Sequence, residues 1–226
     1  CVGTWIVLIA IALAHSAHWY LDADAVHVLH GFGLHPEAFL ATCHKLSESA
    51  TLGDVWDELD SVAGTIIVPL LVYPLIHAGP LHCLVNLLFL HLFGSRLESR
   101  ASTLRFLLFV VSSGLIAGVA EVLLSPANEV VRVGASGTVA AMLGAYLCWY
   151  RSARAVFLVP LVVIPVFARL PVALAGGMWI VMQIAPVARF LGAGGAEPIS
   201  WLAIAMGLLS GFILGPLLLF RHRNSR

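Results

Sequence analysis

Charged side chains are scarce in this sequence: they make up 11% of its 226 residues, whereas 60% of the residues are hydrophobic. So few charges cannot supply the polar surface that a soluble globular protein of this length needs. The mean hydropathy of +0.97 points the same way. The sequence therefore excludes an ordinary soluble domain and predicts an all-α polytopic membrane helix bundle.

Cysteines that could pair in a disulfide and histidines in the second half of the chain are also scarce. There are four cysteines, and Cys43 has no partner on its predicted side of the membrane, so no disulfide is expected. Downstream of Ser136 the chain contains a single histidine, His222, in its basic tail. The chain also shows no internal repeat and no low-complexity tract. The second half of the chain thus offers no histidine base within its apolar segments.

The few charges that are present are distributed unevenly, and their signs predict the topology. From residue 22 to residue 60 there are eight carboxylates and one cation, Lys45, which is typical of an extracytoplasmic segment. Arginines gather near residues 96–105, 151–154 and 221–226, which is typical of cytoplasmic segments. Both termini are therefore expected in the cytoplasm.

Apolar runs between these charge markers predict six transmembrane helices within a single domain, residues 1–226. The expected spans are 2–20, 78–95, 105–124, 136–150, 171–188 and 201–220. Residues 21–77 form an extracytoplasmic loop, 78–220 the helical core and 221–226 a cytoplasmic tail. Apolar residues within the loop favour a structured segment with a helix lying partly in lipid. Residues 155–168 are interrupted by Pro160 and Pro165, so they lie at the inner interface or lengthen the fifth helix.

A serine between two glycines begins the fourth expected helix, in the sequence Gly134-Ala135-Ser136-Gly137. The glycines permit a sharp turn and a close approach of another chain, and the free N–H groups of a helix start can bind an oxyanion near the serine. Small residues also serve as plain packing surfaces in membrane helices, and this tetrapeptide by itself fits that interpretation as well. This tetrapeptide predicts a nucleophile only together with other groups.

Those other groups lie upstream, at His77, His82 and Asn86. Gly79-Pro80 can start a helix, so His82 and Asn86 become neighbours one turn apart on the same face. Both side chains can donate a hydrogen bond to an oxyanion, and His77 can brace the preceding loop. The alternative is a pair of polar side chains that hydrogen-bond one helix to another.

Taken together, these segments resemble the rhomboid family of intramembrane serine proteases. The resemblance runs from about residue 73 to residue 215, and it rests on motifs in family order and spacing. They are His77-Ala-Gly-Pro-Leu-His82-Cys-Leu-Val-Asn86 and the residues to Gly94, Gly134-Ala-Ser-Gly137 through Tyr146, Leu170-Pro171, Trp179, Gln183 and Gly207, Gly211 and Gly215. The resemblance implies a six-helix core with Ser136 as nucleophile, His82 and Asn86 binding the oxyanion, and a cavity that opens outward.

One catalytic position departs from the family. The resemblance places the general-base histidine three residues before Gly207, and this chain has Ile204 there. A serine hydroxyl is a weak nucleophile without a group to take its proton, and isoleucine has none. The residue where the family often packs an aromatic ring on the base is Ala140, which is compatible with a degraded site. The small residues that let these two helices pack closely are kept, with Gly137 in the stripe on the serine helix and Gly207 and Gly211 in the stripe on the last helix.

Two functions follow as competing hypotheses. The first is an endopeptidase that cuts membrane-anchored proteins near the outer face, with His82 or His77 recruited as base. The second is an inactive relative that binds transmembrane helices of client proteins. Either one predicts membrane lipid and membrane-anchored proteins as partners, and neither involves nucleic acid. The chemistry that the resemblance implies is peptide hydrolysis through an acyl-enzyme, with no metal and no cofactor.

Two further interpretations are weaker. Buried histidines at His77, His82 and His91 also occur along ion paths, but paired halves with discontinuous helices are not apparent in the sequence. The pairs His15 with His18 and His27 with His30 have metal-ligand spacing, yet no further ligands complete a set. No metal site is therefore predicted.

Overall fold

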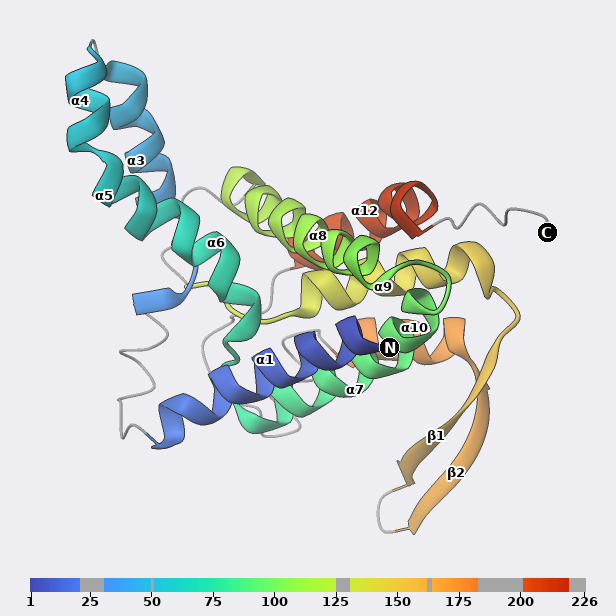
Figure 1. Cartoon of the computed structure of the whole chain (residues 1–226). Helices are drawn as coiled ribbons and strands as arrows, with labels where there is room; N and C mark the ends of the chain where they lie inside the picture. The colour runs from blue at the N-terminus through green and yellow to red at the C-terminus, as the bar shows by residue number, and fades with distance from the viewer. Residues whose placement is uncertain (21–30, 50, 125–130, 162–163, 183–200, 220–226) are drawn as a thin grey trace.

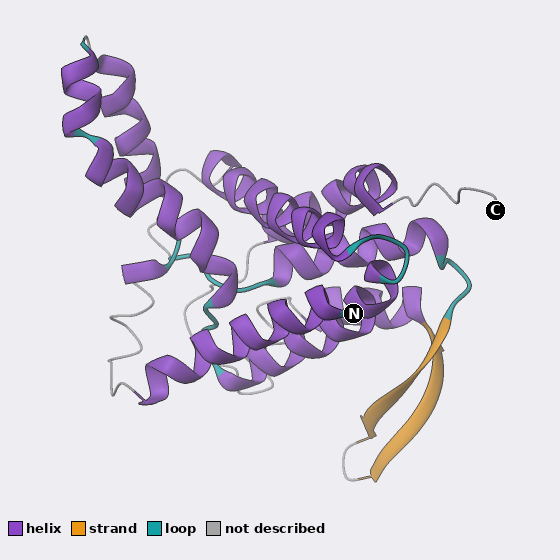
Figure 2. Ribbon diagram, viewed as in Figure 1, coloured by secondary structure: helices purple, strands orange, loops and turns teal. Residues whose placement is uncertain are grey.

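The computed structural model describes residues 1–226 except 21–30, 50, 125–130, 162–163, 183–200 and 220–226. Its described part is a bundle of helices with one β-hairpin extending from it (Figure 1, Figure 2). The bundle helices are α1 (Val2–Tyr20), α7 (Pro80–Glu98), α8 (Thr103–Leu124), α9 (Ser136–Trp149), α10 (Val172–Met182) and α12 (Trp201–Leu219). Each begins within two residues of an expected span, because each follows an apolar run.

Three of these helices are long and apolar enough to cross a membrane, namely those over Pro80–Glu98, Thr103–Leu124 and Leu202–Leu219. The helices over Val2–Ala17, Ser136–Trp149 and Val172–Val181 are apolar but shorter within the described residues. Outward-facing aliphatic side chains such as Leu84, Leu104 and Leu217 are more than half exposed, as expected where lipid rather than water is the solvent. A helical membrane bundle is therefore confirmed, while the number of six crossings stays a prediction.

The segment between α1 and α7 forms a helical arm that returns into the bundle. It consists of α3 (Pro36–Glu48), α4 (Leu52–Asp57), α5 (Leu59–Val62), the π-helix η1 (Ala63–Ile67), α6 (Val68–Val72) and the 3-10 helix η2 (Tyr73–Leu75). Helices α3 and α4 project away from the bundle (Figure 1). At the other end, the Tyr73 hydroxyl donates a 2.7 Å hydrogen bond to the Gly114 carbonyl in α8. The arm thus places its last turn directly beside the core helices.

Helix α9 occupies the centre of the bundle. Every residue from Ser136 to Tyr146 is buried, which requires neighbours on all sides. A Cβ atom on Gly207 would overlap the Gly137 carbonyl, and one on Gly211 would overlap the Ala141 carbonyl. Helices α9 and α12 therefore meet at backbone distance, because small residues alone permit this contact.

The start of α1 is fixed by a carboxylate from α7. Glu98 accepts hydrogen bonds of 2.8 Å from the backbone N–H groups of Gly3 and Thr4, another of 2.8 Å from the Thr4 hydroxyl and one of 2.9 Å from the Thr103 hydroxyl. The first N–H groups of a helix have no partner within it, so an acidic side chain from outside satisfies them. Glu98 thereby joins α1, α7 and the start of α8.

The segment between α9 and α10 differs from the sequence expectation. Strands β1 (Arg154–Leu161) and β2 (Ile164–Pro171) form an antiparallel hairpin, and α10 begins only at Val172. The interpretation that residues 155–168 lengthen the fifth helix is therefore wrong. Pro160 and Pro165 are cross-strand partners, and proline disfavours a helix interior far more than the end of a hairpin.

Candidate functional site

Ser136 is the first residue of α9, at the end of a turn that only glycine adopts easily. Gly134 has a φ of +110°, a conformation that costs other residues free energy. Ala135 is the N-cap of α9 and Ser136 follows, 5% exposed. The helix start directs free N–H groups toward this place, as an oxyanion site requires.

The chain leading to Ser136 is held by backbone hydrogen bonds to the arm. Leu34 and Arg132 form an isolated antiparallel bridge, with N–H to carbonyl distances of 3.0 and 2.8 Å. Two residues later, the Gly134 N–H donates to the Tyr73 carbonyl at 2.9 Å. The serine turn therefore depends on the arm as well as on α9.

His77 links the serine turn to the end of the arm, with one ring nitrogen hydrogen-bonded to each. The Ala135 N–H donates to His77 Nε2 at 3.4 Å, and Nδ1–H donates to the Leu75 carbonyl at 3.3 Å. The ring is 2% exposed. A carbonyl can only accept and an amide can only donate, so this arrangement uses the neutral ring with its proton on Nδ1. Its Nε2 lone pair is consequently occupied.

His82 lies in the first turns of α7, against the serine turn. The point where a Cβ on Gly134 would stand is 2.8 Å from His82 Cε1. The His82 and His77 rings meet edge to face, with centroids 5.1 Å apart and planes at 65°. Within the described part of the chain, the buried Nε2 of His82 has no hydrogen-bond partner. The site therefore holds one imidazole nitrogen that is available for chemistry.

Asn86 follows one turn later on α7 and is fully buried. Its amide Nδ2 donates to the His82 carbonyl at 2.9 Å, a bond that orients the side chain along the helix. The second N–H of the amide remains available as a donor. His82 and Asn86 thus lie on the same face of α7, as their spacing predicts.

Ile204 lies on the face of α12 that packs against α9. It is one turn before Gly207, whose Cα lies against the Gly137 carbonyl, and the Ala203 carbonyl is 3.2 Å from the point where a Cβ on Gly137 would stand. Ile204 is 3% exposed and belongs to the same buried cluster as Ala135. The residue that occupies this level of α12 is therefore aliphatic and close to the start of α9.

Two features of the site escaped the sequence reasoning. The ring of His15, on α1, meets the ring of His77 at 89° with centroids 6.4 Å apart. Glu121 in α8 forms a buried ion pair with Arg132, with Oε1 and Nε 2.7 Å apart. His15 and Glu121 are polar residues within apolar stretches of the sequence, and this pattern could have marked them as candidates for a functional site. Their partners, however, lie too far away in the sequence to be recognised from spacing.

Of the histidines that suggested other functions, His15, His77 and His82 lie together beside the serine turn, whereas His91 lies apart from them. His91 is exposed and its ring lies 5.6 Å from that of Trp5, away from the serine. Among the described residues there is no group of three or more His, Cys, Asp or Glu side chains that could hold a metal ion. His27 and His30 lie outside the described residues.

Replacing Gly134 with alanine is expected to disrupt the serine turn. The φ of +110° and the contact with His82 both oppose a Cβ atom, so the loss of stability should reach about 1–3 kcal/mol. Thermal unfolding of the purified protein in detergent measures this effect. Gly177→Ala is the matched control, because nothing lies within 4 Å of its Cβ position, and it should be neutral or stabilising. Equal behaviour of the two variants would contradict this account of the turn.

Comparison with known proteins points to one family. The family model of the Rhomboid domain matches residues 65–221, which include both α7 and the serine turn. The protein YdcA of Bacillus subtilis (strain 168), provisionally named a rhomboid protease, is 38% identical to this chain over 73 residues. That alignment covers 32% of this chain and 36% of YdcA, so the chain matches little more than a third of this relative's length.

Proposed function

Since the chain belongs to the rhomboid family, we propose that it binds membrane-anchored proteins at Ser136 and hydrolyses them slowly, because Ile204 replaces the general base. The scaffold is that of a rhomboid-like intramembrane protease, and the protein is integral to the membrane. The observation that carries the proposal is the contact of Gly207 with Gly137, because it supports a position for residue 204, one turn earlier on α12, near the level of the serine. The reaction would take place near the outer membrane face, with both termini in the cytoplasm.

In this proposal each surviving group has a role in peptide hydrolysis. Ser136 Oγ attacks the scissile carbonyl, and the oxyanion accepts hydrogen bonds from the Ser136 N–H, the His82 ring and the Asn86 amide. The Ser136 proton passes to the nitrogen of the scissile bond, the C–N bond breaks to release the amine, and water hydrolyses the acyl-enzyme that remains. His77 is a positioning residue: its hydrogen bond with Ala135 holds the neighbouring serine N–H in place. The missing function is removal of the Ser136 proton.

His82 supports a second candidate, an active protease with a recruited base. Both ring nitrogens of His77 are engaged, whereas His82 Nε2 has no partner within the described residues. Of the two histidines considered from the sequence, His82 is therefore the better base. In this case His82 cannot at the same time remain the neutral donor to the oxyanion, so the two candidates assign it opposite roles.

A serine-directed fluorophosphonate probe separates these candidates. If the base is missing, the chain should label at Ser136 orders of magnitude more slowly than Ile204→His, and Ser136→Ala should not label at all. A helical reporter should still co-purify with the intact chain, because binding does not need the base. Labelling as fast as that of Ile204→His, abolished by His82→Ala, would instead support the recruited base and overturn the first proposal.

A further inference from the structure

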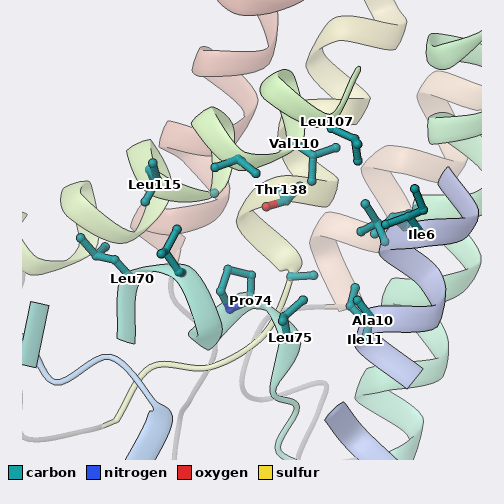
Figure 3. Close-up of a pocket in the computed structure, with 16 residues that line it drawn as sticks. Ile6, Ala10, Ile11, Leu70, Pro74, Leu75, Leu107, Val110, Leu115 and Thr138 are labelled. Atoms are coloured by element: carbon teal, nitrogen blue, oxygen red, sulfur yellow. The ribbon is translucent and has the colours of Figure 1, made fainter. Parts of the chain in front are cut away.

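We propose that a cavity beside the serine turn holds the end of a phospholipid acyl chain. The cavity has a volume of about 270 Å³ and lies between α1, residues 70–75, α8 and the start of α9 (Figure 3). Ala135 and Thr138, on either side of Ser136, form part of its wall. It is separate from the histidines that surround the serine, since neither His77 nor His82 lines it.

The wall of the cavity is almost entirely hydrocarbon. Aliphatic side chains such as Ile11, Leu75 and Val110 enclose it, and the hydroxyl of Thr138 is the one polar side-chain group among its lining residues. A water molecule needs two to four polar partners to occupy a cavity, and apolar cavities of this size stay dry. The occupant must therefore be apolar.

The size of the cavity excludes a helix. A helix with its side chains is about 10–12 Å across, and the cavity is a narrow space already bounded by α1, residues 70–75, α8 and the start of α9. A transmembrane segment of a client protein therefore does not fit, whereas a single narrow alkyl chain does. This separates the cavity from the place at Ser136 where the proposed function binds a membrane-anchored protein.

The position of the cavity indicates where the acyl chain comes from. Its lining residues Ile6 and Ile11 lie along the first half of α1, and residues 107–115 lie in the middle of α8, which is long enough to cross the membrane. Ile6 on α1, Leu71 on α6 and Val111 on α8 line it and are still 49%, 51% and 48% exposed, so the cavity opens toward lipid where these three helices meet. At that depth a bilayer offers acyl chains and little else. The surrounding phospholipid is therefore the natural ligand.

An acyl chain in this cavity would support the serine turn from behind. The segment 70–75 that lines it also supplies the Tyr73 carbonyl, which accepts from Gly134, and the Leu75 carbonyl, which accepts from His77. Filling the space on one side of this segment keeps these two carbonyls in position. Lipid thereby becomes a structural part of the site.

Photolabelling tests this assignment with the full chain in lipid nanodiscs. The probe is a phosphatidylcholine with a diazirine near the end of one acyl chain, and adducts are mapped by peptide mass spectrometry. Adducts are expected on the cavity-facing residues of α1 and on residues 70–75. Ala10→Trp, which fills the cavity from α1, should abolish them, and Val110→Phe, which fills it from α8, should do the same.

The control is Leu13→Trp, on the lipid-facing surface of α1, where the side chain is 66% exposed. This variant should leave the cavity adducts unchanged, and circular dichroism of every variant confirms that it is folded. The proposal fails if adducts appear only on outward-facing residues such as Ile9 and Leu13, which would indicate ordinary boundary lipid. It also fails if folded Ala10→Trp and Val110→Phe both retain the adducts, or if a second copy of the chain is found to cover the opening.

Discussion

Replacing Ile204 with histidine is expected to raise hydrolysis of a membrane-anchored reporter by roughly 10⁴-fold or more, which is the usual effect of one member of a serine catalytic unit. The contact between Gly207 and Gly137 places this position at the level of Ser136, so a histidine there starts close to the hydroxyl it must deprotonate. Ile204 is 3% exposed within the main buried cluster, and an imidazole has a volume similar to that of its side chain. The gain should appear in kcat, because binding of the reporter does not depend on the base.

Two variants control for this result. Ile204→Leu keeps the volume and the apolar character, so it should change stability by less than about 1.5 kcal/mol and leave hydrolysis at its starting rate. Adding Ser136→Ala to Ile204→His should remove the restored activity completely, which shows that Ser136 is the nucleophile. If folded Ile204→His binds the reporter but cuts no faster than Ile204→Leu, then the loss of one side chain does not explain the site.

The helix bundle was largely predictable from the sequence because membrane helices can be recognised from the length of their apolar runs. The expected spans 2–20, 105–124 and 201–220 agree with α1, α8 and α12 to within two residues at each described end. The hairpin at β1 and β2 was not predictable, since a short apolar run between arginines fits a strand and a helix equally well. Length and flanking residues were insufficient to decide between them.

For the site, spacing within one helix was informative and contacts between distant segments were not. The four-residue spacing of His82 and Asn86 sufficed to place both on one face of α7. The contact of His15 with His77 joins α1 to a loop 62 residues later, and no local sequence pattern predicts it. The roles of these side chains in catalysis remain predictions, which the variants described above test.

The buried pair of Glu121 and Arg132 should be highly sensitive to substitution. The two side chains are only 2% and 9% exposed, and the Glu121 carboxylate also accepts a hydrogen bond from the Ala203 N–H at the start of α12. Removing one member of such a pair leaves a buried charge without compensation. Arg132→Met alone is therefore expected to destabilise the protein by about 3–5 kcal/mol, measured as the free energy of unfolding in detergent.

The double variant Glu121→Leu with Arg132→Met distinguishes the charge effect from simple loss of packing. Two apolar side chains can replace a buried ion pair at little cost, so the double variant should recover most of the stability that Arg132→Met loses. The exposed pair His44 with Glu48 is the matched control, because its side chains are 73% and 68% exposed. Glu48→Gln should change stability by about 0.5 kcal/mol or less.

The location of this pair gives it a second, separable effect. Arg132 forms the isolated bridge that leads into the serine turn, and Glu121 accepts a hydrogen bond from Ala203 in the first turn of α12, one residue before Ile204. In the Ile204→His background the double variant should therefore recover stability but not the full kcat, because the apolar pair no longer aligns the two segments. Full recovery of both would mean that packing alone positions residue 204 against Ser136, and that the ion pair contributes only to stability.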